Sequence, residues 1–91
     1  MLVNQLQRYV GHEVKVVEVV FNYKGHEFVE CEASEHDTVL NEIRQQVEDA
    51  GYVTRVWFPG TVGTMELRGD RINVYVEKVQ DHYEIVSIVV G

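Results

Sequence analysis

Hydrophobic and polar positions along the chain follow a pattern typical of short strands around one amphipathic helix. Residues 14–21 are dense in valine on both faces of a pleat, which predicts a central strand that is covered twice. Turn-forming residues follow at 22–25, and residues 28–33 are predicted to form a partner strand. Residues 13–33 are therefore expected to form a β-hairpin, whose register the pattern leaves open.

The next segment has the period of a helix. Ser34 or Asp37 can cap its N-terminus. Gly51 stands where a left-handed C-terminal cap is expected, so the helix should end there. One face of the helix is predicted to carry the apolar positions Val39, Leu40, Ile43, Val47 and Ala50.

Three further strands are predicted at 53–58, 71–77 and 83–90, with a polar turn at 80–82. The connection 59–69 is rich in Gly and Thr, too long for a tight turn and without an amphipathic period. The simplest packing runs the strands on either side of it in parallel, with the connection exposed at one edge. These features predict an α+β fold of one domain, residues 1–91, in which a single helix packs on a small mixed sheet in the order β-β-α-β-loop-β-β.

Net charge and cysteine content reduce the number of functions that the sequence could support. Fifteen acidic against eight basic residues give a formal net charge of −7, which disfavours nucleic acid as a partner. No apolar run approaches the roughly 20 residues needed to span a bilayer, so no membrane partner is expected. Residues 1–10 lack the pattern of a secretory signal. Cys31 is the only cysteine, which excludes an intramolecular disulfide, and we interpret it as structural.

Residues 58–76, FPGTVGTMELRGDRINVYV, resemble the reactive loop and following strand of the potato inhibitor I family, which includes the eglins and barley chymotrypsin inhibitors. The likeness extends over roughly the last 55 residues and is strongest at 64–71. It implies that Met65 fills the specificity pocket of a serine protease and that Met65-Glu66 is the scissile bond. Arg71, with Asn73, would brace the loop from below. The implied reactive loop comprises Thr61, Val62, Gly63, Thr64, Met65, Glu66, Leu67 and Arg68.

The chain departs from this family in four places, one of which is a residue missing between Pro59 and Gly60. Asn73 stands where the family has a second arginine, and it can make fewer bonds to the loop. Gly63 replaces a bulkier residue and adds backbone freedom. The hairpin 13–33 has no counterpart in simple members, so residues 34–91 would form the inhibitor-like core. The implied function is reversible, substrate-like inhibition of subtilisin-type or chymotrypsin-type endopeptidases, and no cofactor is needed for it.

Other functions find less support in the residues. The histidines lack the spacing of metal ligands, so no metal site is predicted. Ser34 and Ser87 have no nucleophile elbow around them, and an enzyme is not expected. The tripeptide Arg68-Gly69-Asp70 matches a cell-adhesion motif that occurs often by chance. The remaining rival is a protein-binding adaptor resembling a β-grasp domain, in which the loop is incidental. The sequence does not identify the protease, the compartment or the oligomeric state.

Overall fold

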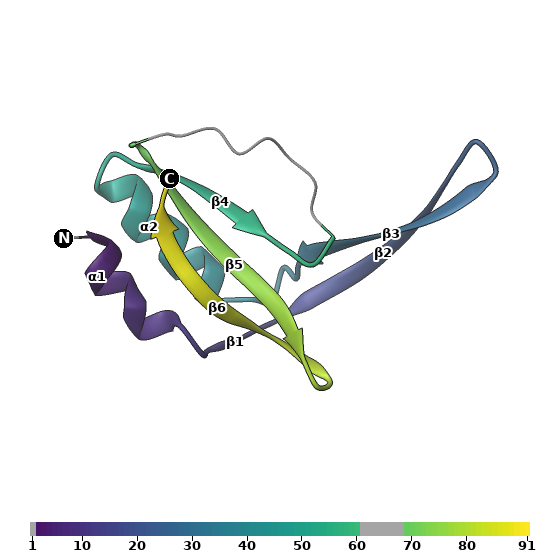
Figure 1. Ribbon diagram of the computed structural model, residues 1–91, viewed down its shortest axis with the longest axis horizontal. Coiled ribbons are helices and arrows are strands. Elements are labelled where there is room, and N and C mark those ends of the chain that lie inside the picture. Colours follow the sequence, from purple (N-terminus) through teal and green to yellow (C-terminus); the bar gives the residue numbers. More distant parts are fainter. Residues whose placement is uncertain (1, 61–68) are drawn as a thin grey trace.

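The computed structural model describes residues 2–60 and 69–91. These residues form an α+β domain with two short helices, a four-stranded mixed sheet and a separate β-hairpin (Figure 1). The α+β class and the mixed sheet are confirmed. The expectation of a single helix is wrong, because α1 (Leu2–Leu6) and a 3-10 turn (Gln7–Tyr9) precede the first strand. Leu2, Leu6 and Tyr9 recur at spacings of four and three, which is a helical stripe, and the latter two are buried.

The main sheet has the strand order β1-β6-β5-β4. The strands β4 (Val53–Trp57) and β5 (Arg71–Val79) are parallel, as predicted, with Val53 opposite Arg71 and Trp57 opposite Tyr75. A two-residue turn joins β5 to the antiparallel β6 (His82–Val90), and the short β1 (Glu13–Val14) completes the other edge. The polar turn expected at 80–82 is therefore one residue shorter, because His82 already belongs to β6.

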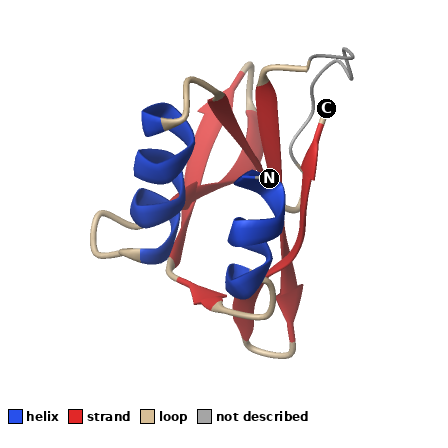
Figure 2. Ribbon diagram, turned by 90° about the vertical axis from the view of Figure 1, so that its left-hand side faces the viewer, coloured by secondary structure: helices blue, strands red, loops and turns tan. Residues whose placement is uncertain are grey.

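Both helices lie against the same face of this sheet (Figure 2). Side chains from the two helical segments, from alternate positions of β5 and from β6 on either side of a register shift form one core. Its buried members are Leu6, Tyr9, Val14, Leu40, Ile43, Val47, Ile72, Val74, Val76, Ile85 and Ile88. Because successive strand residues point to opposite faces, Arg71, Asn73 and Tyr75 lie on the face away from the helices. We call this the outer face. Within the part of the chain that is described, no helix is long and apolar enough to cross a membrane.

Helix α2 (Val39–Asp49) begins two residues after Asp37 and ends two residues before Gly51, close to the bounds that the sequence predicts. Of the two candidate caps, Asp37 is the one that bonds the helix: its Oδ2 accepts the N–H of Leu40 at 2.8 Å. Gly51 has φ of 82°, and the N–H of Tyr52 reaches the carbonyl of Val47, which completes a left-handed cap. The predicted apolar face is confirmed at its buried positions Leu40, Ile43 and Val47, whereas Ala50 is exposed.

The predicted hairpin exists, but its burial is the opposite of the expected one. Among the strands of residues 2–60 and 69–91, β2 (Val16–Tyr23) and β3 (His26–Ala33) pair only with each other, and apart from Val16 every residue of β2 is exposed. The expectation of a central strand covered twice is therefore wrong. The high valine content reflects the preference of β-branched side chains for extended backbone, and in this hairpin the valines form strands without being buried.

The hairpin extends away from the rest of the domain. The N–H of Ser34 bonds the carbonyl of Lys15 at 2.8 Å, so the chain leaves and returns at one point. Glu13 and Val14, which the sequence placed in the hairpin, instead form β1. Residues 16–33 project away from the sheet and helices (Figure 1), and we call them the arm. The molecule is accordingly elongated, with a longest extent of 46 Å.

Candidate functional site

The implied reactive loop, Thr61 to Arg68, lies outside the described residues, as do Met65 and Glu66. The segments that lead to it are described. Phe58, Pro59 and Gly60 follow the end of β4, and Gly69 and Asp70 precede the start of β5. Because β4 and β5 are parallel, the two attachment points of the segment lie at opposite ends of this strand pair.

Arg71 is the first residue of β5 and is buried on the outer face, with only 6% of its surface exposed. Its Nε donates to the main-chain oxygen of Gly91 at 2.8 Å, and the N–H of Gly91 donates to the carbonyl of Arg71 at 3.0 Å. A buried arginine at this position is unusual, because charged side chains are rarely buried unless they have partners. The structure thus fixes this guanidinium beside the end of the segment.

Asn73 lies two positions further along the same face and is also buried. Its Nδ2 donates to the main-chain oxygen of Gly91 at 2.8 Å, and its Oδ1 accepts the Nε1–H of Trp57 at 3.0 Å. The two residues that the resemblance singles out as braces therefore converge on one acceptor, Gly91. Whether they also contact the loop concerns residues outside the described ranges.

Aromatic side chains of β4 and β5 lie beside this polar cluster. The rings of Trp57 and Tyr75 are stacked, with centroids 6.1 Å apart, and the guanidinium of Arg55 lies 4.3 Å from the centre of the Trp57 ring. Sequence reasoning missed these residues and Gly91. The signal that could have found them is the parallel register, which places Trp57 opposite Tyr75 and next to Asn73 on one face.

The inner half of the arm, toward the sheet, lies beside the segment that leads into the loop. Val29, Glu30 and Cys31 of β3 face Phe58 to Gly60 across a hollow of about 370 Å³. Tyr83 of β6 holds the arm in place, because its hydroxyl donates to Glu18 Oε1 at 2.7 Å and lies 3.8 Å from Cys31 Sγ. The bond to Glu18, supported by the Cys31 contact, raises the pKa of Tyr83 well above its usual value of 10.0.

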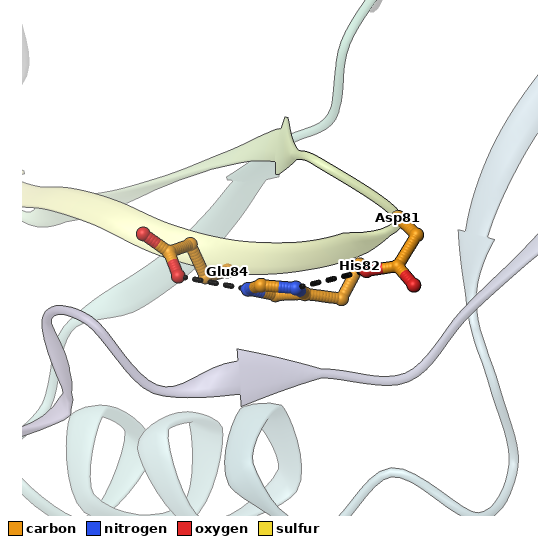
Figure 3. Close-up of polar contacts among 3 residues, drawn as sticks. All are labelled: Asp81, His82 and Glu84. Atoms are coloured by element: carbon orange, nitrogen blue, oxygen red, sulfur yellow. Dashed lines mark hydrogen bonds and ion pairs between the residues drawn. The ribbon is translucent and has the colours of Figure 1, made fainter.

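A second ionisable group stands at the β5–β6 turn (Figure 3). His82 Nε2 lies 3.1 Å from Glu84 Oε2, and its Nδ1 lies 3.6 Å from Asp81 Oδ1. The hydrogen bond to Glu84 is the main cause that raises the pKa of His82 above 6.5; Asp81 adds to it and partial burial opposes it.

This raised pKa gives a pH prediction. The protonated imidazole is stabilised in the folded state, so its contribution to stability is fully present below pH 6.5 and is lost as the pH rises through the raised pKa. Replacing Glu84 with Gln should lower the pKa of His82. An NMR titration of the ring protons in both proteins measures this shift, with the other three histidines as internal references. An unchanged His82 midpoint in Glu84→Gln would show that Glu84 is not the cause.

Among residues 2–60 and 69–91, no three His, Cys, Asp or Glu side chains stand where they could hold a metal ion. No family model, curated protein or solved structure matches the chain. The likeness to potato inhibitor I therefore stays a prediction, which rests on the residues quoted above.

Proposed function

We propose that the chain inhibits serine endopeptidases of the subtilisin or chymotrypsin type by offering them residues 61–68 as a substrate-like loop. Met65 would occupy the primary pocket, and Met65-Glu66 would be the scissile bond. The observation that carries the proposal is the buried Arg71 on the outer face, two residues beyond Gly69 and tied to Gly91 at 2.8 Å. Such a site suits a residue that organises the adjacent segment.

The physical advantage of a braced loop is entropic. A flexible peptide loses conformational freedom when a protease binds it, whereas a loop already held extended has met that cost on folding. A planar guanidinium can serve two acceptors at once, and a fixed one can hold both sides of a scissile bond. If the bond is cut, the new amine stays close to the acyl-enzyme, so religation competes with hydrolysis.

A second candidate is the protein-binding adaptor. The observation that favours it is the arm, where Val20 and Val29 are more than half exposed. The two candidates differ in where binding energy resides: in the loop for the inhibitor, in the arm for the adaptor.

The deciding experiment titrates the folded chain against subtilisin, chymotrypsin, elastase and trypsin. We expect inhibition of proteases with apolar primary pockets and little inhibition of trypsin, whose pocket carries a carboxylate. Mass spectrometry after long incubation should find slow cleavage at Met65-Glu66 and at no other bond. Folded protein that leaves subtilisin, chymotrypsin and elastase fully active at micromolar concentration would favour the adaptor.

A further inference from the structure

The arm carries apolar side chains into solvent and leaves both of its edges unpaired by any described strand. A two-stranded hairpin without cover is marginally stable in water, and an open strand edge is a template for another strand. Its exposed apolar side chains are Val17, Val19, Val20, Phe21, Tyr23, Phe28 and Val29. An exposed apolar hairpin of this kind is expected to be stabilised by a partner that pairs with its edge.

The two edges of the arm differ in charge. Over its eight residues β2 carries one carboxylate, Glu18, and no basic side chain, whereas the eight residues of β3 carry three glutamates and a histidine. Charged side chains on an edge strand discourage pairing. The edge that remains open to another strand is therefore that of β2.

The turn of the arm fixes which backbone groups are available on that edge. Lys24 and Gly25 have φ of 51° and 78°, the pattern of a two-residue type I′ turn, so Tyr23 and His26 form a hydrogen-bonded pair. Hydrogen-bonded and non-hydrogen-bonded pairs alternate along an antiparallel ladder. The N–H and C=O groups that point outward from β2 consequently belong to its even-numbered residues, Val16, Glu18, Val20 and Asn22.

We propose that the chain forms a two-fold dimer in which β2 pairs antiparallel with β2 of a second copy, centred on Val20. The outward-pointing N–H and C=O groups of the two β2 strands meet only when even-numbered residues of one copy lie opposite even-numbered residues of the other. A register shifted by one residue would place even-numbered residues opposite odd-numbered ones, so it is excluded. Centred on Val20, the ladder covers residues 17–23 of both copies and sets Val17 opposite Tyr23 and Val19 opposite Phe21. Such pairs of β-branched and aromatic side chains are favourable across strands. Glu18 faces Asn22, so no like charges are opposed.

A second observation supports this register. The register centred on Val20 places Lys24, in the turn of the second copy, opposite Val16 at the start of β2. Beside that base lies a hollow of about 300 Å³ whose lining includes Val16 and Val17. Its lining also holds the carboxylates of Glu13 and Asp81 against the single ammonium of Lys15. His82 also lines this hollow. When its imidazole is neutral, the two carboxylates exceed the one ammonium by a single negative charge, which is complementary to the incoming Lys24.

The same arrangement limits the assembly to two copies. In the four-stranded sheet β3-β2-β2-β3, the outer edges are the charged β3 strands, which discourage further pairing. A two-fold contact of one patch with itself is closed. Because one strand pair buries less than the roughly 1,200 Å² of stable interfaces, we expect a dimer that exchanges with monomer at micromolar concentration. This inference does not depend on protease binding.

Sedimentation in the presence of a reductant tests the proposal with a matched pair of variants. Val20 on β2 and Val29 on β3 face each other across the hairpin and are 54% and 59% exposed, so lysine at either position should leave the fold intact. We expect a concentration-dependent dimer for the natural chain, at least a tenfold weaker one for Val20→Lys and little change for Val29→Lys. A natural chain that stays monomeric up to about 1 mM, the weak end of specific association, would overturn the proposal. Equal weakening by both variants would overturn it as well.

Cross-linking tests the register. In a Cys31→Ser background, Val20→Cys should form a disulfide between copies under mild oxidation, because hydrogen-bonded partners have Cα atoms about 5.5 Å apart. Val29→Cys should not, since its two copies would be separated by three strand spacings, about 14 Å. Circular dichroism verifies that both proteins are folded. If the two variants cross-link at equal rates, the β2 edge is not the interface.

Discussion

Replacing Met65 with lysine is expected to move inhibition from subtilisin and chymotrypsin to trypsin. In a substrate-like inhibitor the primary pocket provides a large and locally determined part of the discrimination between proteases. An apolar pocket would have to bury an unpaired ammonium group, whereas the carboxylate of the trypsin pocket would pair with it. Replacing Met65 with glycine should instead weaken inhibition of every apolar-pocket protease by about 2–4 kcal/mol, or roughly 30-fold to 1,000-fold.

The measurement is the inhibition constant of each variant against the four proteases, with circular dichroism as the test of folding. Gln45→Lys is the matched control, because it makes the same change in net charge on the exposed face of α2. If Met65→Lys and Gln45→Lys change inhibition equally, net charge and not the pocket is responsible. If the natural chain and both Met65 variants behave alike, Met65 does not enter the pocket.

The parts of the fold that follow from local signals are predictable from the sequence. The apolar stripe of α2, its cap at Asp37 and its end at Gly51 depend on residues within one or two turns of each other. The alternation of β5, with Ile72 and Val74 inward and Asn73 outward, is equally local. The parallel pairing of β4 and β5 followed from the simplest packing of the helix on strands that a long connection joins.

The exposure of the arm could not be predicted in this way. A strand of β-branched residues has the same pattern whether its two faces are covered by protein or not, so Val17 and Val20 suggested a buried strand. The short helix α1 was missed because a stripe of three apolar residues at the start of the chain is a weak signal. To predict the exposure of the arm or the presence of α1, one must know which segments of the chain pack against each other.

The candidate site shows the same division. The spacing of Arg71 and Asn73 after the loop drew attention to them, and both are buried on the outer face. Their shared acceptor, Gly91, is 18 residues or more away along the chain, and the Trp57 bond to Asn73 crosses from another strand. Contacts of this range depend on sheet register, which no motif contains.

Replacing Arg71 with alanine is expected to convert a durable inhibitor into a faster substrate. The change removes the hydrogen bond to Gly91 on the outer face, and bonds of charged groups contribute about 1.5–3 kcal/mol. A cost of that size lowers the melting temperature but leaves the α2 core, on the other face of the sheet, in place. The loop, in contrast, would lose its brace. Cleavage at Met65-Glu66 by subtilisin should then accelerate by roughly tenfold to a hundredfold.

The appropriate control is Arg55→Ala, which removes an arginine from the same face but leaves Arg71, Asn73 and their bonds to Gly91 untouched. Cleavage is followed by mass spectrometry well below the melting temperature of all three proteins, so that cutting at Met65-Glu66 is separated from digestion of unfolded chains. A loop-specific brace requires that Arg71→Ala accelerates this one cut and that Arg55→Ala does not. Equal rates for the natural chain and Arg71→Ala would remove Arg71 from the mechanism, because a loop that keeps its bound shape without the guanidinium is held by something else.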